Sequence, residues 1–135
     1  MKCFEDNLVK TFYYEEFNVG LGVWKGNGVG SDYRTSMSKI LDLIKEKQIT
    51  RWVGDVSEFG VVSRENKDWT NAVWFPGAMA AGLRRMAVVL PKDIFGSMSA
   101  KEVLAKVTED VHIRNFDDLE KAKKWIKEEV LTSQP

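Results

Sequence analysis

The chain has 135 residues, of which 44% are hydrophobic and 30% are charged, and 20 basic side chains balance 20 acidic ones. This length and composition are those of a globular chain that buries one core, not of a disordered segment. The zero formal net charge gives no electrostatic reason to expect nucleic acid or an anionic membrane as a partner, and a single cysteine, Cys3, excludes an intrachain disulfide.

Two strands are predicted near the N-terminus. Residues 8–14 are β-branched and aromatic, and residues 17–25 alternate large apolar side chains with small or polar ones. We expect an antiparallel pair, and we expect the glycine-rich stretch 26–30 to end the second strand in a tight turn. Its G-x-G-x-G spacing, with no lysine after the last glycine, matches neither a dinucleotide fingerprint nor a phosphate-binding P-loop, so no nucleotide is predicted.

The middle of the chain alternates helical and strand patterns. Apolar residues at helical spacing predict a helix over residues 32–48, and a short buried strand over 50–56 follows it. Residues 66–82 form a second helical region, which Pro76 should kink because proline lacks a backbone donor and clashes with the preceding turn. The glycine that ends this region is a natural C-terminal cap, and the apolar run 86–90 is typical of a central strand.

The C-terminal third repeats this alternation. A capping-box sequence at residues 99–102 predicts a short helix that extends to Val107. Residues 111–116 alternate again and predict a last strand. The acidic cap at residues 117–120 then begins a terminal amphipathic helix, whose apolar face runs from Leu119 to Val130.

This order of elements predicts an α/β fold. Strands that alternate with helices of ten or more residues require crossover connections, which give a largely parallel sheet covered by helices. We therefore expect a mostly parallel central sheet of about five strands with an N-terminal antiparallel pair, flanked by about four helices. No repeat, linker or low-complexity segment divides the sequence, so residues 1–135 are assigned to a single domain.

Short motifs spread over most of the chain keep one order: Tyr33-Arg34, Trp52-Val53-Gly54-Asp55-Val56-Ser57, Trp69, Trp74-Phe75-Pro76, Ala81-Gly82, Met86-Ala87-Val88-Val89-Leu90-Pro91, and the segment from Asn115 to Ile126. In this order they resemble the STAS domains, the family of bacterial anti-sigma-factor antagonists. Within that family they are most similar to the SpoIIAA-like branch, which is sometimes grouped with lipid-binding SEC14 names. The resemblance implies the same layout of strands and helices as the periodicity does.

The resemblance also implies regulation by phosphorylation of a serine after the central strand. By position, Asp55 and Ser57 resemble the first half of the family's phosphorylated region, whereas Ser63 and its neighbours replace the Asp-Ser-Ser-Gly run of the second half. Ser63 and Ser57 are therefore the candidate phospho-acceptors, with Ser63 the better one. All three residues should lie at the carboxyl end of a central strand, where open α/β sheets place their ligands, although turn and cap chemistry explains the same residue types.

Aromatic side chains gather around the proline kink. Trp69, Trp74 and Phe75 flank Pro76, where a helix cannot bury every side equally. Large aromatics usually complete a core, but tryptophan is also enriched at recognition surfaces. We therefore expect these three side chains, together with Asp55, to form a partner or ligand surface.

Catalytic and metal-binding patterns are missing from the sequence. His112, the single histidine, lies in a predicted strand, and no G-x-S-x-G nucleophile elbow is present. One histidine and one distant cysteine supply no metal-ligand spacing, so no catalytic residue, metal or cofactor is predicted. The N-terminus lacks the apolar core of a signal peptide and no apolar run has the length of a membrane span, so we expect a cytoplasmic location.

These observations favour a non-catalytic regulatory or protein-interaction domain that responds to phosphorylation. The alternative is a carrier of a small apolar or lipid-like ligand, held between the sheet and the kinked helix. A closed apolar cavity would favour the carrier, and flat exposed aromatics would favour a protein contact. An enzyme is the weakest hypothesis, and a homodimer would cover a free sheet edge or an apolar helix face.

Overall fold

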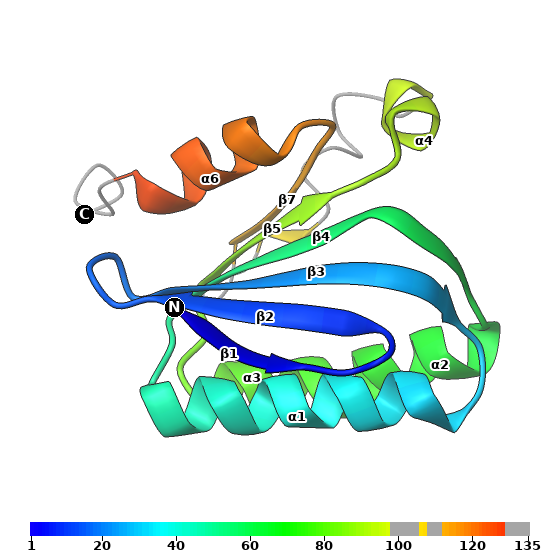
Figure 1. The fold of residues 1–135 in the computed structure, drawn as a ribbon, viewed down its shortest axis with the longest axis horizontal. Helices are drawn as coiled ribbons and strands as arrows, with labels where there is room; N and C mark the ends of the chain where they lie inside the picture. The colour runs from blue at the N-terminus through cyan, green and yellow to red at the C-terminus, as the bar shows by residue number, and fades with distance from the viewer. Residues whose placement is uncertain (98–105, 108–111, 129–135) are drawn as a thin grey trace.

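The structure, a computed structural model, describes residues 1–97, 106–107 and 112–128. Within these ranges the chain forms one mixed sheet with helices on both faces (Figure 1). The strands are β1 (Lys2–Glu5), β2 (Val9–Tyr14), β3 (Val19–Gly28), β4 (Arg51–Val62), β5 (Arg85–Val89), β6 (Lys106–Val107) and β7 (His112–Phe116). The helices are α1 (Ser31–Lys47), α2 (Arg64–Trp69), the π-helical turn η1 (Thr70–Trp74), α3 (Phe75–Ala80), α4 (Lys92–Gly96) and α6 (Leu119–Lys127).

The described strands lie in the order β1-β2-β3-β4-β5-β7-β6. The four central strands β3, β4, β5 and β7 are parallel, while β1 and β2 at one edge and β6 at the other pair antiparallel with their neighbours. The parallel centre and the antiparallel β2–β3 pair confirm the predicted α/β class. The sequence pattern does not predict β1, because its few residues, KCFE, carry no clear alternation.

Two strands run past their predicted ends. β3 continues to Gly28 and β4 to Val62, and the two extensions pair with each other, Gly26 beside Phe59 and Gly28 beside Val62. The prediction that the glycine-rich stretch ends β3 in a tight turn is therefore wrong for its first residues. Gly26 has a φ of 90° beside an irregularity in the strand register, so these glycines bend the strand where they were expected to end it.

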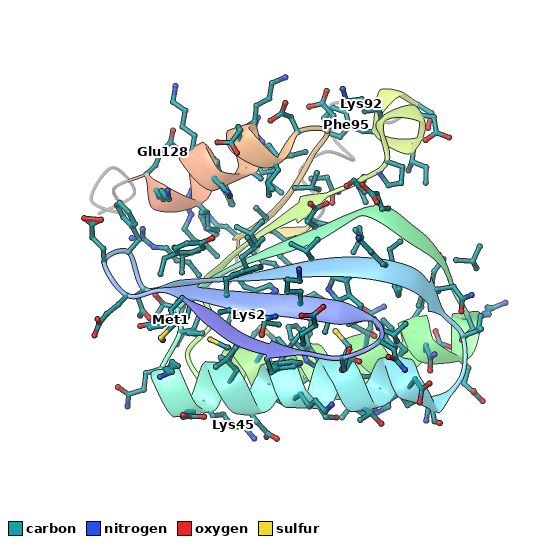
Figure 2. The ribbon with its side chains drawn as sticks, in the orientation of Figure 1. Met1, Lys2, Lys45, Lys92, Phe95 and Glu128 are labelled. Carbon is teal, nitrogen blue, oxygen red and sulfur yellow. The ribbon has the colours of Figure 1, made fainter. Side chains whose placement is uncertain are left out.

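Alternate residues of the central strands face different helices. Trp52 of β4 packs in a cluster with α1 and α3, whereas Val53 packs in a second cluster with α6. Figure 1 shows α1, α2 and α3 on one face of the sheet and α6 on the other. The outer surface of α1 is polar, and Lys45 points away from the sheet into solvent (Figure 2).

The helical segment 64–80 changes its geometry in the middle. α2 passes into η1, where the backbone N–H of Phe75 bonds to the carbonyl of Thr70, and α3 carries Pro76 in its first turn. The wider π turn accommodates a proline that an uninterrupted α-helix would exclude, which confirms a break at Pro76. Gly82, with a φ of 113°, ends the segment as predicted.

The terminal helix α6 is held at both ends. Asp118 accepts two backbone hydrogen bonds from its first turn, as the predicted acidic cap requires. Arg51 and Arg85 donate to backbone carbonyls at its C-terminal end, and the Arg85 guanidinium lies 4.0 Å from the centre of the Trp125 ring. These contacts fix α6 across β4 and β5.

Other predictions for the C-terminal third have mixed outcomes. The capping box at residues 99–102 and the end of the apolar face at Val130 lie outside the described residues. Val107, which we expected in a helix, lies in β6 and pairs with His112 of β7, so a strand pairing replaces the helical pattern there. The short helix α4 after β5 was not expected.

Candidate functional site: an apolar groove

An apolar groove of about 480 Å³ lies between the sheet and the helices α1, α2 and α3, with α4 at one end. This volume falls in the range of small-molecule binding sites. The residues that line it are almost all apolar: Trp24, Tyr33, Met37, Ile40, Trp52, Gly54, Val56, Phe59, Gly60, Val61, Val62, Lys67, Thr70, Trp74, Phe75, Met86, Val88, Leu90, Pro91 and Ile94.

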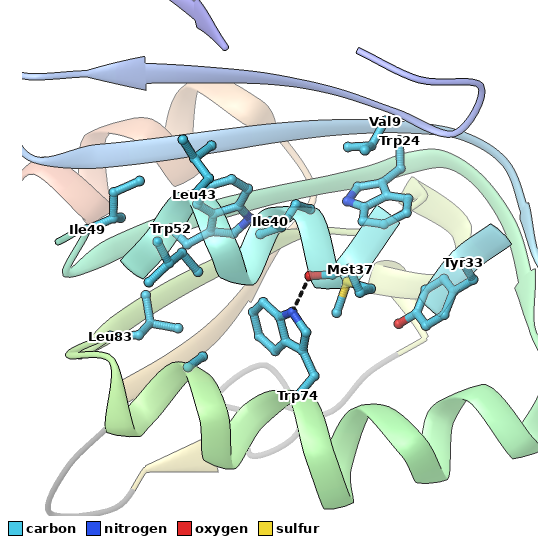
Figure 3. Packing of buried hydrophobic residues seen from close by; sticks show 12 residues of the cluster. Val9, Trp24, Tyr33, Met37, Ile40, Leu43, Ile49, Trp52, Trp74 and Leu83 are labelled. Atoms are coloured by element: carbon cyan, nitrogen blue, oxygen red, sulfur yellow. Dashed lines mark hydrogen bonds between the residues drawn. The ribbon is translucent and has the colours of Figure 1, made fainter. Parts of the chain in front are cut away.

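The floor of the groove lies deep inside the molecule. Ile40, Trp52 and Trp74 line it although each exposes 1% of its surface. Figure 3 shows these three side chains in one buried cluster with Trp24 and Tyr33. Because so little of these three side chains is exposed, they support the groove from behind, and the surface open to a bound molecule belongs to half-buried lining residues such as Val56, Phe59 and Met86.

Two glycines shape this floor. A Cβ atom on Gly20 would lie 2.3 Å from the Trp52 ring, so the indole packs directly on the bare backbone of β3. Gly54 lies two residues after Trp52 on the same face of β4, and a Cβ there would meet its nearest neighbour, Met86 Cε, at 3.7 Å. The indole therefore fills the space above one glycine, while the space above the other belongs to the groove.

The polar atoms in the groove wall are paired. Trp74 Nε1 donates to the Met37 carbonyl at 2.7 Å, which ties η1 to α1 (Figure 3). The Tyr33 hydroxyl lies 2.9 Å from Thr70 Oγ1. Burial raises the pKa of the Tyr33 hydroxyl above its ordinary value of 10.0, so it stays protonated at neutral pH. The wall thus presents mainly apolar surface, and none of the buried side-chain polar atoms of the described residues lacks a hydrogen-bond partner.

Asn66 fixes the end of the groove next to α2. Its Nδ2 donates to the carbonyls of Gly28 at 2.6 Å and Gly30 at 3.0 Å, and its Oδ1 accepts from Arg34 Nε at 2.9 Å. The side chain is buried, and these bonds join the end of β3 to the start of the helical segment.

The mouth of the groove opens between the end of β4, α2 and α4. Val61 exposes 72% of its surface and Ile94 exposes 51%, although both are apolar and line the groove. Lys67 of α2 is the charged side chain at this mouth, and among the described lining residues there is no carboxylate and no histidine.

The residues predicted for a partner or ligand surface lie in different places. Trp74 and Phe75 line the groove. The Trp69 ring is outside this lining and packs edge-on against Tyr33, with the Arg34 guanidinium 5.9 Å from its centre. Asp55 is also outside the lining, and its carboxylate accepts hydrogen bonds within β4.

The candidate phospho-acceptor serines have local hydrogen bonds. Ser57 Oγ donates to Asp55 Oδ1 at 2.7 Å, and Ser63 Oγ accepts from the backbone N–H of Asn66 at 3.2 Å as the cap of α2. β4 continues to Val62, so Asp55 and Ser57 lie inside this strand, with Asp55 beside Val89 at the carboxyl end of β5, while Ser63 directly follows the end of β4.

Two further classes of site are not found in the part of the chain that the structure describes. No group of three or more His, Cys, Asp or Glu side chains there could hold a metal ion. None of the helices there has both the length and the apolar composition needed to cross a bilayer.

Comparisons with known proteins agree with this fold. A family model described as SpoIIAA-like matches residues 23–127. The chain belongs to the SpoIIAA-like family. The match spans all the groove-lining segments and confirms the resemblance found in the sequence motifs.

One solved structure extends the likeness of this SpoIIAA-like chain to nearly its whole length. It is the crystal structure of an uncharacterized protein of the DUF3478 family with a SpoIIAA-like fold from Shewanella loihica PV-4. The TM-score is 0.54 and the identity 14%, over 92% of this chain and 99% of that one, so the likeness shows the fold alone. No curated protein matches the chain.

Sequence reasoning missed Gly54, Lys67 and Thr70 as parts of the site. Lys67, Thr70 and Trp74 are spaced as one face of a helix, and this spacing is the signal that could have linked the two polar residues to the predicted tryptophan. Gly54 carries no such signal in the sequence, because its place in the groove lining depends on which side chains surround it in the fold.

Proposed function

We propose that this SpoIIAA-like domain is a non-catalytic binding module that holds a small apolar molecule in the groove. The depth of the groove is the observation that supports this function best. Buried aromatic side chains support it, half-buried apolar residues supply its open surface, and no buried side-chain polar atom of the described residues lacks a hydrogen-bond partner. An apolar molecule there would remove both its own surface and the lining surface from water.

Burial of apolar surface also gives a quantitative expectation. Each buried methylene group is worth roughly 0.8 kcal/mol, which is about a fourfold gain in affinity per added carbon. A series of linear alcohols should therefore bind more tightly as the chain lengthens, until the groove is full. Because Trp24, Trp52 and Trp74 all line the groove, intrinsic tryptophan fluorescence can follow the titration.

The variant Gly54→Leu tests whether binding occurs in the groove. Its added side chain has room at the Cβ position and extends into the groove, so we expect at least a tenfold loss of alcohol affinity in a folded protein. Gly96→Leu on α4 is the matched control, because a Cβ there meets no atom within 4 Å and the residue is outside the groove lining. No alcohol binding to the wild type, or unchanged binding to Gly54→Leu, would contradict the proposal.

The second candidate function is regulation through a protein partner, with phosphorylation of Ser63 or Ser57. The position of Ser63 favours it, because this serine caps α2 directly after Val62 and four residues before Lys67, both of which line the groove. A phosphate on Ser63 would put a dianion near the mouth and change what the groove accepts. Mass spectrometry of the protein from its native host should then find phosphate on Ser63, and unmodified serines at both positions would argue against this function.

A further inference from the structure

Lys67 is distinct among the residues that line the groove. It is the single charged side chain in the described lining, and it lies on the same side of the helical segment as Thr70 and Trp74. Its ammonium group makes no hydrogen bond and no ion pair with a described residue. Nearby Arg34, by contrast, is bonded to Asn66 and lies 3.4 Å from Glu65.

The single charge in the described lining favours an anion over a cation. No carboxylate lines the groove within the described residues, so an anion at Lys67 meets no like charge inside it. Glu65, the acidic residue two positions before Lys67, is directed to Arg34. Lys67 would repel a cationic head group, and a neutral one would form no ion pair with it and leave the exposed ammonium to water.

We infer that the ligand of the groove is a single-chain amphiphile with a terminal carboxylate, whose alkyl chain lies along the apolar lining while its carboxylate pairs with Lys67. This inference rests on the proposed function and adds the class of ligand. The half-buried apolar lining accommodates the chain, and the exposed mouth keeps the charged end in water, where it needs no desolvation.

The expected contribution of Lys67 is modest because the residue is exposed. Solvent-exposed ion pairs typically give an affinity gain of about two- to fivefold. This gain should fall as the salt concentration rises, because mobile ions screen exposed charges. Most of the affinity therefore comes from the chain, and Lys67 selects the head group.

The test compares three ligands with the same chain on the intact protein: dodecanoate, 1-dodecanol and dodecyltrimethylammonium, each titrated by tryptophan fluorescence at pH 8 below its aggregation threshold. We expect dodecanoate to bind about two- to fivefold more tightly than the alcohol, and the cation to bind more weakly than both. In Lys67→Met the ratio of dodecanoate affinity to alcohol affinity should fall to about one, and in Lys67→Glu the preference should reverse.

Lys92→Met on α4 is the matched control, because it removes the same charge from a residue outside the groove lining and should preserve the preference. Circular dichroism checks that each variant is folded, and Lys67→Glu provides a second readout at the same position. If the three ligands bind equally and Lys67→Met changes nothing, the carboxylate inference fails while the proposed function stands. If none of the three binds, the proposed function itself fails.

Discussion

The sheet face under α6 and the face under α1, α2 and α3 use alternate residues of the same strands, but they pack differently. Between the body of α6 and the sheet the described side chains leave a hollow of about 70 Å³, and a more open depression of about 520 Å³ lies at the start of α6, whereas the opposite face contains the apolar groove of about 480 Å³. The α6 face is built mainly from aliphatic and small residues such as Val53, Ala87 and Ile126. These side chains interlock closely, so this layer serves stability.

The groove face combines large rings with glycines. Trp52 fills the space above Gly20 tightly, whereas the space above Gly54 is less crowded, with Met86 Cε and Trp52 Nε1 at van der Waals distance from a Cβ placed there. On the other side, the hydrogen bond from Trp74 to Met37 holds η1 against α1. Rigid aromatic walls do not collapse into the space that a glycine leaves, and the groove lies on the same sheet that packs against α6 on its other face.

The two faces should differ most in the loss of stability that follows truncation of a side chain. Ile126→Ala should lower the free energy of unfolding by about 3 kcal/mol, because it opens a cavity in a close-packed layer. Met86→Ala should cost about 1 kcal/mol, because Met86 is half-buried and already borders open space. Chemical denaturation with matched slopes measures both values. Equal losses would show that the two layers are packed alike.

Replacement of a small residue by a larger one should give the opposite pattern, with a smaller effect on the free energy of unfolding. Ala87→Leu inserts a larger side chain into the filled α6 layer and should cost about 2 kcal/mol. Gly54→Leu enters the groove and should change the free energy of unfolding by less than about 1 kcal/mol. Thermal unfolding of the two variants beside the wild type tests this, and a Gly54→Leu protein that unfolds as early as Ala87→Leu would mean that the groove is not open.

The smallest expected effect concerns pH. Asp6, in the β1–β2 loop, accepts hydrogen bonds from Leu8, Val9 and Ser36, so it joins this loop to α1 on the groove side. Partial burial acts to raise the pKa of Asp6, but the hydrogen bonds from Val9, Leu8 and Ser36 outweigh it and hold the pKa below the ordinary value of 3.8. The stabilisation is therefore complete above pH 3.8 and is lost as the pH falls through the lower folded-state value.

The variant Asp6→Asn measures this contribution. It should cost about 1 kcal/mol at neutral pH, because charged acceptors make stronger hydrogen bonds than amides. Its stability should also depend less on pH than that of the wild type between about pH 5 and pH 3. Identical pH profiles for the two proteins would contradict the role of the Asp6 carboxylate.

The sequence supports prediction of the fold class because periodicity depends on local neighbours. The helix α1, the parallel strands and the break at Pro76 all follow from spacing and from proline chemistry. The ends of β3 and β4 could not be predicted in this way. Gly26 and Gly28 have the sequence pattern of a turn, and only the pairing of the two strands shows that they belong to β3.

The residues of the groove were predicted only in part, for a similar reason. The proline kink correctly drew attention to Trp74 and Phe75, which line it. An empty volume, however, depends on which side chains meet across layers, and the sequence does not show that the Trp52 ring packs tightly on Gly20 while Gly54 has only looser contacts. In the sequence, Lys67 has the features of any solvent-exposed helix residue, and its place at the groove depends on where α2 lies in the fold.

The π-helical turn η1 has a consequence for how this domain could diversify. Such a turn holds one more residue than an α-helical turn and lies directly before Pro76, so regular geometry would need both the removal of one exposed residue such as Val73 and the replacement of this proline. Every side chain before that point would then rotate relative to those after it, and Lys67 would no longer share a side with Trp74. Two local changes would thus alter which side chains face the groove while the strands and α6 stay unchanged.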